Sequence, residues 1–259
     1  MPGQHGKFCW YELLTSDTAG AEKFYRAVVG WSFEPLGVAG PEPYNILKTG
    51  EHGVAGMMKL PEEAKAQGAR PHWVGYIWVD DVDATAAKIA EKGGKVYRQP
   101  DDIPNIGRFA IVADPQGAVF ALFKDVGTTE PTHPAPGAPG TIGWRELLAQ
   151  NWETDFAFYA ELFGWTKDVA HDMGPMGTYQ IFATGGEVTG GMMTKPADVP
   201  AAFWGYYIVV EGGAKAAAER ITGAGGTVLN GPMEVPGGSW IVQGFDPQGA
   251  MFAVVSPQA

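Results

Sequence analysis

The chain has 259 residues, of which 45% are hydrophobic, and this is enough apolar material for two compact cores. Its formal net charge of -11 argues against partners that need a basic surface, namely nucleic acids and anionic membranes. The sequence contains neither an apolar run that could span a bilayer nor an N-terminal signal peptide, and its single cysteine excludes an internal disulfide. We therefore expect a cytoplasmic protein.

The first quarter of the chain predicts one helix and several strands. The apolar run 8–14 is typical of a short strand. Asp17 can cap a helix that carries its apolar residues on one face and ends at Gly30. Further strands are predicted near residues 31–33, 44–47 and 54–58. The order is βαβββ.

The second quarter repeats this order. A strand is predicted at 73–79, followed by a helix that Asp81 can cap and that ends at Gly93 and Gly94. The last three strands are predicted near residues 95–97, 109–112 and 119–123. The sequence Asp-Pro-Gln-Gly at 114–117 suits a tight turn, so the last two strands should form a hairpin.

The second half of the chain repeats the first. The segments 10–14, 56–58 and 114–118 return in closely similar form as 144–148, 191–193 and 246–250. A repeat of this length is the size of a domain, not of a solenoid unit. We therefore predict an α+β fold of four βαβββ modules, divided into a first domain at 1–126, an extended proline- and glycine-rich linker at 127–140 and a second domain at 141–259.

Four such modules in one chain resemble the vicinal oxygen chelate superfamily, which includes glyoxalase I, bleomycin-resistance proteins and extradiol dioxygenases. The motifs that carry the resemblance are Asp17 with Phe24-Tyr25 and Gly30-Trp31, the segment Val79-Asp80-Asp81-Val82-Asp83, and the two Asp-Pro-Gln-Gly turns. The sequence is similar to a two-domain, glyoxalase-like bacterial subgroup. The resemblance implies two glyoxalase-like domains with curved, cup-shaped mixed sheets, helices on the convex side and a ligand on the concave side.

The resemblance also implies positions for a divalent metal. Members that carry out chemistry hold the metal with His, Gln or Glu side chains from the first and last strands of each module. Counted from the shared motifs, these positions fall on Trp10, Gly56, Val74, Ala121, Trp144, Gly191, Gly205 and Ala253. None of these side chains can bind such a cation. We therefore predict no metal and no other cofactor, although a divalent metal is the family default.

Two glutamates remain as candidate site residues. Side chains alternate along a strand, so Glu12 shares a face with Trp10, and Glu146 shares a face with Trp144. A carboxylate in an apolar cup must be hydrogen-bonded, paired or protonated. Glu12 and Glu146 could therefore bind a ligand or act as catalytic bases. Alternatively, each could bond a neighbouring Trp, Tyr or backbone donor and have only a structural role.

His72 shares a face with Val74 and could reach the mouth of a cup, but a lone histidine beside Trp73 is also typical of packing or of the surface. Cys9 falls on the helix side of its strand, which favours a small buried hydrophobic residue over a nucleophile. The predicted ligand-binding residues are Trp10, Glu12, His72, Val74, Ala121, Trp144, Glu146, Gly205 and Ala253.

Two functions are compatible with these residues. The first is a metal-free protein that binds a small organic ligand in aromatic-lined cups, as bleomycin-resistance proteins do. The second is an enzyme, a glyoxalase-like lyase or isomerase or a dioxygenase- or hydroxylase-like protein, with unorthodox site residues. An interaction protein with degenerate cups is a third possibility. The tandem chain already contains the pair of domains that single-domain relatives obtain by dimerising, so we expect a monomer or weak homodimer.

Overall fold

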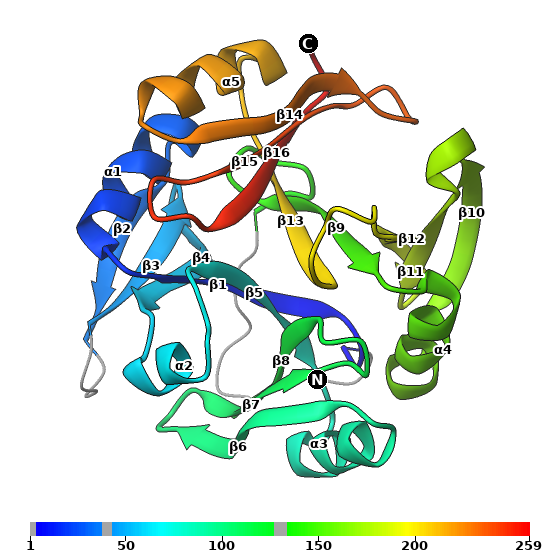
Figure 1. Ribbon diagram of the computed structural model, residues 1–259. Coiled ribbons are helices and arrows are strands. Elements are labelled where there is room, and N and C mark those ends of the chain that lie inside the picture. The colour runs from blue at the N-terminus through cyan, green and yellow to red at the C-terminus, as the bar shows by residue number, and fades with distance from the viewer. Residues whose placement is uncertain (1–3, 38–42, 127–133) are drawn as a thin grey trace. The chain divides into compact units, whose positions relative to one another are not determined.

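The computed structural model of the chain describes residues 4–37, 43–126 and 134–259 (Figure 1). The first half contains β1 (Phe8–Thr15), α1 (Thr18–Val29), β2 (Ser32–Leu36), β3 (Tyr44–Thr49), β4 (His52–Lys59), α2 (Glu62–Ala66), β5 (His72–Trp78), α3 (Val82–Glu91), β6 (Lys95–Ile103), β7 (Gly107–Ala113) and β8 (Val119–Asp125). The second half contains β9 (Ile142–Ala149), α4 (Trp152–Phe163), β10 (Thr166–Asp172), the 3-10 helix η1 (Gly174–Met176), β11 (Thr178–Thr184), β12 (Glu187–Thr194), β13 (Phe203–Val209), α5 (Gly213–Gly223), β14 (Thr227–Glu234), β15 (Trp240–Phe245) and β16 (Met251–Ser256). None of the helices in these ranges is long and apolar enough to cross a membrane.

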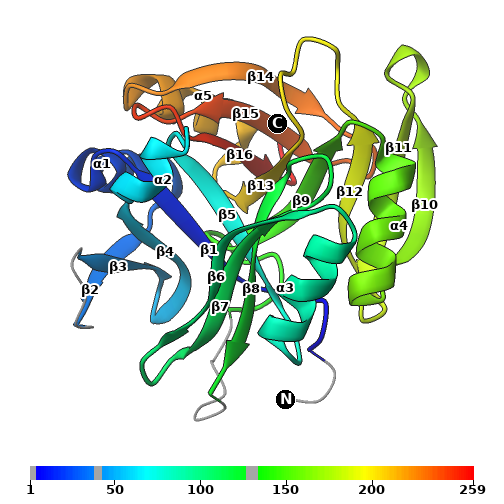
Figure 2. The same ribbon diagram turned by 60° about the horizontal axis from the view of Figure 1, so that its bottom comes forward.

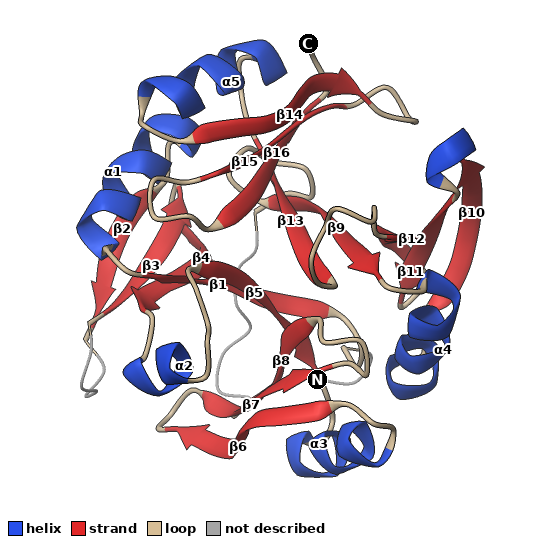
Figure 3. Cartoon of the chain, in the orientation of Figure 1, coloured by secondary structure: helices blue, strands red, loops and turns tan. Residues whose placement is uncertain are grey.

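The strands form two eight-stranded mixed sheets, drawn in red in Figure 3. The first sheet has the order β2-β3-β4-β1-β5-β8-β7-β6, and the second has the order β10-β11-β12-β9-β13-β16-β15-β14. Each sheet takes its strands from one half of the chain. We number the modules 1 to 4 in chain order, beginning at β1, β5, β9 and β13. The predicted α+β fold of repeated βαβββ modules is confirmed.

The predicted helix ends are also confirmed. The Asp17 carboxylate accepts a hydrogen bond from the backbone N–H of Gly20 at 3.1 Å and caps α1. Asp81 accepts from the N–H of Ala84 at 2.9 Å and caps α3. Gly30 ends α1 in the left-handed conformation, with φ of 87°, which glycine adopts without strain. The short helix α2 was not expected from the sequence pattern.

The Asp-Pro-Gln-Gly motif closes the β7–β8 hairpin as predicted. The backbone N–H of Gly117 donates to the carbonyl of Asp114 at 3.1 Å. The side chain of Asp114 accepts from the N–H groups of Gln116 and Ala118, each at 2.9 Å. Asp246 makes the same bonds in the second half. In both turns, one carboxylate oxygen is used to fix the turn and the other is left to bond elsewhere.

The chain is organised in two compact units, and each unit combines a module from either half. Unit 1 comprises Met1–Cys9, Val74–Pro131 and Arg145–Trp204, and therefore modules 2 and 3. Unit 2 comprises Trp10–Trp73, Thr132–Trp144 and Gly205–Ala259, and therefore modules 1 and 4. Within unit 2, α1 and α5 lie side by side, as Figures 1 and 2 both show. Sheet pairing thus follows the halves, whereas helix packing crosses them.

A buried tyrosine joins the two modules of unit 2. The hydroxyl of Tyr25, on α1, donates to Asp246 in the turn of module 4 at 3.1 Å and accepts from the indole N–H of Trp73 at 2.9 Å. The Tyr25 ring also contacts the rings of Trp31 and Phe252. Burial and the charge of Asp246 raise the pKa of Tyr25, so it remains a neutral donor.

Unit 1 contains the equivalent arrangement. The hydroxyl of Tyr159, on α4, donates to Asp114 of module 2 at 2.9 Å and accepts from the indole N–H of Trp204 at 2.9 Å. Tyr159 stacks on Trp165 with ring centroids 4.9 Å apart. The motifs that repeat in the sequence therefore hold modules from different halves together, and most of the aromatic residues in them belong to the cores.

The predicted linker is partly described. Residues 134–140 form a loop with turns, and 127–133 lie outside the described residues. The indole N–H of Trp31 donates to the carbonyl of Gly140 at 2.8 Å, and the hydroxyl of Thr49 donates to the carbonyl of Pro139 at 2.9 Å. The end of the loop is thus fixed against module 1. The domain boundaries predicted at 126 and 141 remain a prediction.

Candidate functional site

The strand register shows which side chains of module 1 share a face. Glu12 on β1 lies opposite Gly56 on β4, whereas Leu13 lies opposite Met57. Leu13 and Met57 are completely buried. Because neighbouring side chains alternate, Trp10, Glu12 and Gly56 lie on the other face of these strands. We call this the Glu12 face.

Tyr44, on β3, fills the space above Gly56. A Cβ atom at Gly56 would overlap the phenol of Tyr44, so only glycine allows the ring to lie there. The indole N–H of Trp10 donates to the Tyr44 hydroxyl at 3.0 Å, and that hydroxyl donates to the carboxylate of Glu12. Trp10, Tyr44 and Glu12 therefore form a connected group on one face of three neighbouring strands.

The electrostatics of this group follow from its burial. Glu12 is 7% exposed, whereas Trp10 and Tyr44 are half-buried. Burial, and then the charge of Glu12, raises the pKa of Tyr44 well above its ordinary value. Tyr44 is therefore a neutral hydrogen-bond donor at physiological pH. A carboxylate held by a neutral phenol beside an indole can recognise a hydroxyl or a cationic nitrogen on a flat molecule.

Module 3 has a related arrangement. Glu146 on β9 lies opposite Gly191 on β12, and a Cβ atom at Gly191 would overlap the ring of Tyr179. Glu146 is half-buried. Trp144, on the same strand, packs in unit 2 against a cluster that includes Tyr207. A tyrosine ring packed over a glycine thus occurs in both halves of the chain.

The other predicted site residues are mostly buried within their modules. Val74 and Ala121 are 1% and 0% exposed, and Ala253 is 2% exposed. Gly205 is half-buried on β13. His72 has its Nδ1 2.7 Å from the carbonyl of Arg70, two residues away, and burial lowers its pKa, so it stays neutral. These residues can shape a binding surface, but none of them contributes a charged group to it.

The positions at which the resemblance predicts a metal do not fit one in this chain. They hold Trp, Val, Ala and Gly side chains, and tyrosine rings cover Gly56 and Gly191. Within the described ranges, no group of three or more His, Cys, Asp or Glu side chains is placed to hold an ion. An indole N–H, a phenol and a single carboxylate are a poor set for the divalent cations that such sites take.

Cys9 lies at the start of β1, and its thiol approaches the carbonyl of Tyr76 at 3.5 Å. Burial, and then the charge of Asp125, raises the pKa of the thiol far above its usual range. Because the thiolate is the reactive form, the environment of Cys9 is that of an inert residue.

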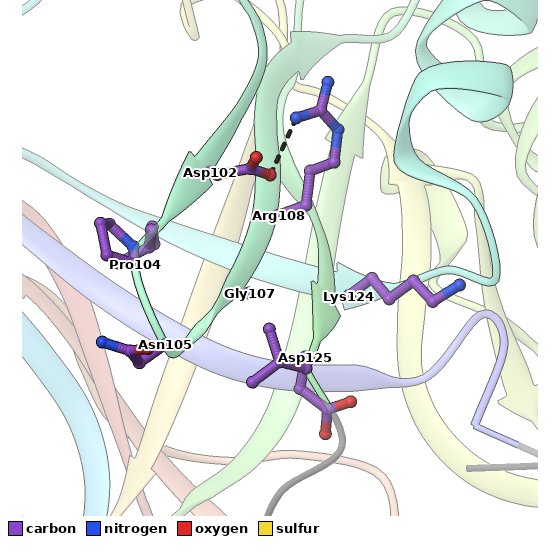
Figure 4. A pocket seen from close by; sticks show the side chains of 9 residues that line it. Asp102, Pro104, Asn105, Gly107, Arg108, Lys124 and Asp125 are labelled. Carbon is purple, nitrogen blue, oxygen red and sulfur yellow. Dashed lines mark hydrogen bonds and ion pairs between the residues drawn. The ribbon is translucent and has the colours of Figure 1, made fainter.

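Unit 1 also contains an open pocket of about 360 Å³ at the β6–β7 hairpin and the end of β8 (Figure 4). Its cationic side chains already have partners. Arg108 bonds both oxygens of Asp83 at 2.6 and 2.8 Å and Asp102 at 2.8 Å, and Lys124 bonds the carbonyl of Asp80 at 2.5 Å. None of the predicted site residues lines this pocket. We do not assign a function to it.

Sequence reasoning missed several polar and aromatic residues of these faces. Tyr44 was assigned only to a strand and Tyr179 was not singled out, although the two occupy equivalent positions in the two halves. Tyr207 and Gln243, which are hydrogen-bonded to each other, were also missed. The recurrence of Tyr two residues before Ile, at 44–46 and 179–181, was the signal that could have found the first pair.

The comparisons with known proteins agree with this architecture. Residues 7–122 match the family described as Glyoxalase/Bleomycin resistance protein/Dioxygenase superfamily. The chain is 32% identical over 252 residues to "Putative glyoxylase CFP32" of Mycobacterium tuberculosis, with 96% of this chain and 94% of the relative covered. The chain belongs to this superfamily. It is also 28% identical to "Anthracycline biosynthesis protein DnrV" of Streptomyces peucetius, with 96% of this chain and 93% of that protein covered.

Solved structures show the same fold at low sequence identity. The Mn(II)-bound glyoxalase from Novosphingobium aromaticivorans superposes with a TM-score of 0.65 at 18% identity, covering 99% of this chain and 83% of that one. Homoprotocatechuate 2,3-dioxygenase from Arthrobacter globiformis gives a TM-score of 0.66 at 14% identity, covering 98% of this chain and 80% of that one. These likenesses concern the fold, whereas the predicted membership of the superfamily is confirmed by the 32% identity to the mycobacterial relative.

Proposed function

We propose that the protein binds a small, flat, hydroxyl-bearing organic molecule on the Glu12 face, without a divalent metal. The observation that carries this proposal is the hydrogen-bonded group of Trp10, Tyr44 and Glu12. Trp10 is one of the positions at which the resemblance predicts a metal ligand. A half-buried indole offers a stacking surface, and the carboxylate offers a directional acceptor beside it.

The relatives support the choice of ligand class. One is named for anthracycline biosynthesis, and anthracyclines are flat, hydroxylated polycyclic molecules. A molecule of this kind presents an aromatic surface for the Trp10 ring and hydroxyl or amino groups for Glu12. The proposal that the site works without metal rests on its side chains, which are poor ligands for the divalent cations of the enzymes.

An enzyme is the alternative function. Its support is the contact between the Tyr44 hydroxyl and the Glu12 carboxylate, because such a pair could move a proton to or from a ligand hydroxyl. In this alternative, Glu12 acts as a metal-free base. One relative is named as a putative glyoxylase, and this name also denotes an enzyme. Turnover of the ligand, and not its binding alone, separates the two functions.

The test is a titration with doxorubicin, a fluorescent anthracycline that carries hydroxyl groups and one amine. We expect saturable binding by the wild-type protein and a loss of about ten- to a hundredfold in affinity for Glu12→Gln, since a charge-assisted hydrogen bond contributes about 1.5–3 kcal/mol. Glu63→Gln, an exposed glutamate on α2, is the matched control and should bind as the wild type does.

Metal analysis and product analysis complete the experiment. A first-row metal that remains bound at one ion per chain, or doxorubicin binding that Glu12→Gln leaves unchanged, would contradict the proposal. Chemical conversion of the ligand by the metal-free protein, abolished in Glu12→Gln, would favour the enzyme instead.

A further inference from the structure

Module 4 carries a row of four residues that crosses all of its strands. Tyr207 on β13 lies opposite Ala253 on β16, Ala253 lies opposite Gln243 on β15, and Gln243 lies opposite Asn230 on β14. Residues directly opposite each other on neighbouring strands point to the same face. We call this the Gln243 face. It belongs to unit 2.

The polar members of the row are linked. The amide nitrogen of Gln243 donates to the hydroxyl of Tyr207 at 2.6 Å, and the amide nitrogen of Asn230 donates to the carbonyl oxygen of Gln243 at 3.2 Å. Since Tyr207 and Gln243 are two strands apart, the tyrosine reaches across Ala253, whose small side chain leaves room for it. Tyr207 is 3% exposed, Gln243 is half-buried and Asn230 is exposed. The chain of hydrogen bonds therefore runs from the core to solvent.

An apolar wall lies beside this chain. Tyr207, Ile241 and Ala253 form a buried cluster, against which the half-buried Trp144 and Val255 pack. Amide and phenol groups at the edge of an aromatic wall are suited to a flat ligand with carbonyl and hydroxyl substituents. No member of the row is ionisable near neutral pH, which distinguishes this face from the Glu12 face.

The fold does not require the amides. In module 2 the equivalent row is Tyr76, Ala121, Ile111 and Arg98, in the same register. Isoleucine thus takes the place of Gln243, and arginine the place of Asn230. Since the same strands pair with isoleucine at this position, a structural requirement of the module does not explain the glutamine.

We propose that the Gln243 face is a second small-molecule site, distinct from the Glu12 face, and that it selects uncharged flat ligands bearing carbonyl and hydroxyl groups. Gln243 and Asn230 exchange hydrogen bonds with the ligand, and Trp144 supplies the stacking surface. The ligand class is related to that of the proposed function, but the site does not depend on Glu12.

The test uses 1,8-dihydroxyanthraquinone, which is uncharged in mildly acidic solution, titrated by calorimetry into the full-length protein. We expect Gln243→Ile, which introduces the residue of module 2, to weaken binding by about tenfold or more, as expected when a partly buried hydrogen bond is lost. Gln243→Glu keeps the size of the side chain, and its carboxylate cannot donate to Tyr207; it should weaken binding similarly. Glu234→Gln, an exposed change on β14, is the control and should bind normally, since Glu234 lies opposite Trp240 and therefore on the other face from Ile241 and Gln243.

The two sites are separated by the Glu12→Gln variant. We expect it to bind 1,8-dihydroxyanthraquinone as the wild type does, while losing affinity for doxorubicin. Failure of the quinone to bind the wild type, or equal binding by the wild type and both Gln243 variants, would overturn the second site. Either result leaves the doxorubicin test of the Glu12 face unaffected. Loss of quinone binding in Glu12→Gln alone would also overturn it, because the ligand would then belong to the Glu12 face.

Discussion

Asp155 is a buried carboxyl group whose removal should make the protein more stable. It lies in the first turn of α4, is 1% exposed, and its Oδ2 is buried without a hydrogen-bond partner among the described atoms. Burial, and then the charge of Asp114, raises the pKa of Asp155 from 3.8 to about 8. The equivalent position on α1 is Ala21, so the helix does not need a carboxylate there.

The sign and size of the effect follow from proton linkage. The unfolded chain loses this proton near pH 3.8, whereas the folded chain holds it until about pH 8. Between these values the folded state binds more protons, so stability falls as the pH rises, and above pH 8 the penalty is complete. At 1.36 kcal/mol per pH unit the upper bound is about 5–6 kcal/mol. Relaxation and water around the charge reduce this, and we expect about 2–4 kcal/mol.

The assay is urea unfolding of the wild type and of Asp155→Asn at several pH values. We expect the variant to be more stable, by a difference that grows between pH 5 and pH 8 and then levels off. Asp155→Ala, which introduces the residue found at the equivalent position of α1, should behave in the same way. Glu153→Gln, which neutralises an exposed acid in the same turn, should show no such growth.

A destabilising charge on Asp155 is contradicted if Asp155→Asn is no more stable than the wild type at pH 8. An equal difference in stability at pH 5 and pH 8 would also contradict it, because the gain would then have no connection with ionisation. A gain that Glu153→Gln reproduces would point to the net charge of the helix and not to burial.

Further outcomes are expected from packing, from the buried networks and from the tandem architecture. Gly56→Ala should destabilise the protein by about 1–3 kcal/mol in thermal melts, because the added Cβ overlaps Tyr44. Gly223→Ala, which has open space around it in a helix, is the control and should be neutral or stabilising. Equal effects of the two changes would contradict the close approach of Tyr44 to Gly56. Tyr25→Phe and Tyr159→Phe should each lower the free energy of unfolding by about 1–3 kcal/mol, since each leaves a buried carboxylate and a buried indole N–H without the phenol hydroxyl. A change of under about 0.5 kcal/mol would show that water replaces the hydroxyl. Cys9 should resist a thiol reagent at pH 8 in the folded protein and react in urea, because its pKa is raised; rapid labelling of the folded protein would refute this. Light scattering should give a monomer or weak dimer, and a stable larger assembly would contradict that expectation.

Local features of the fold could be predicted because their causes lie within a few residues. Asp17 and Asp81 cap helices whose first turns follow them directly, and Gly30 ends a helix through its own backbone freedom. The Asp114 turn is closed by groups only four residues apart. Because these signals recur in both halves, the order of the modules followed from the sequence.

The candidate site was predicted in part. Trp10 and Glu12 could be placed on one face by strand alternation, and Glu12 is buried there. Tyr44 was not recognised as their partner, since β3 is reached through a segment of the sequence with no periodic pattern. The Tyr207–Gln243 bond was missed for a different reason, because its two residues lie on strands that the chain joins only through other elements.

The repeated βαβββ modules, the helix ends and the hairpin turns could be predicted from the sequence, because each depends on residue type and short spacing. The three-dimensional structure alone shows that the turn of one half binds the helix of the other, through Tyr25 with Asp246 and Tyr159 with Asp114. It alone also placed a tyrosine ring above Gly56. These contacts join residues that are distant along the chain, and their partners are selected by packing in a shared core and not by any local preference.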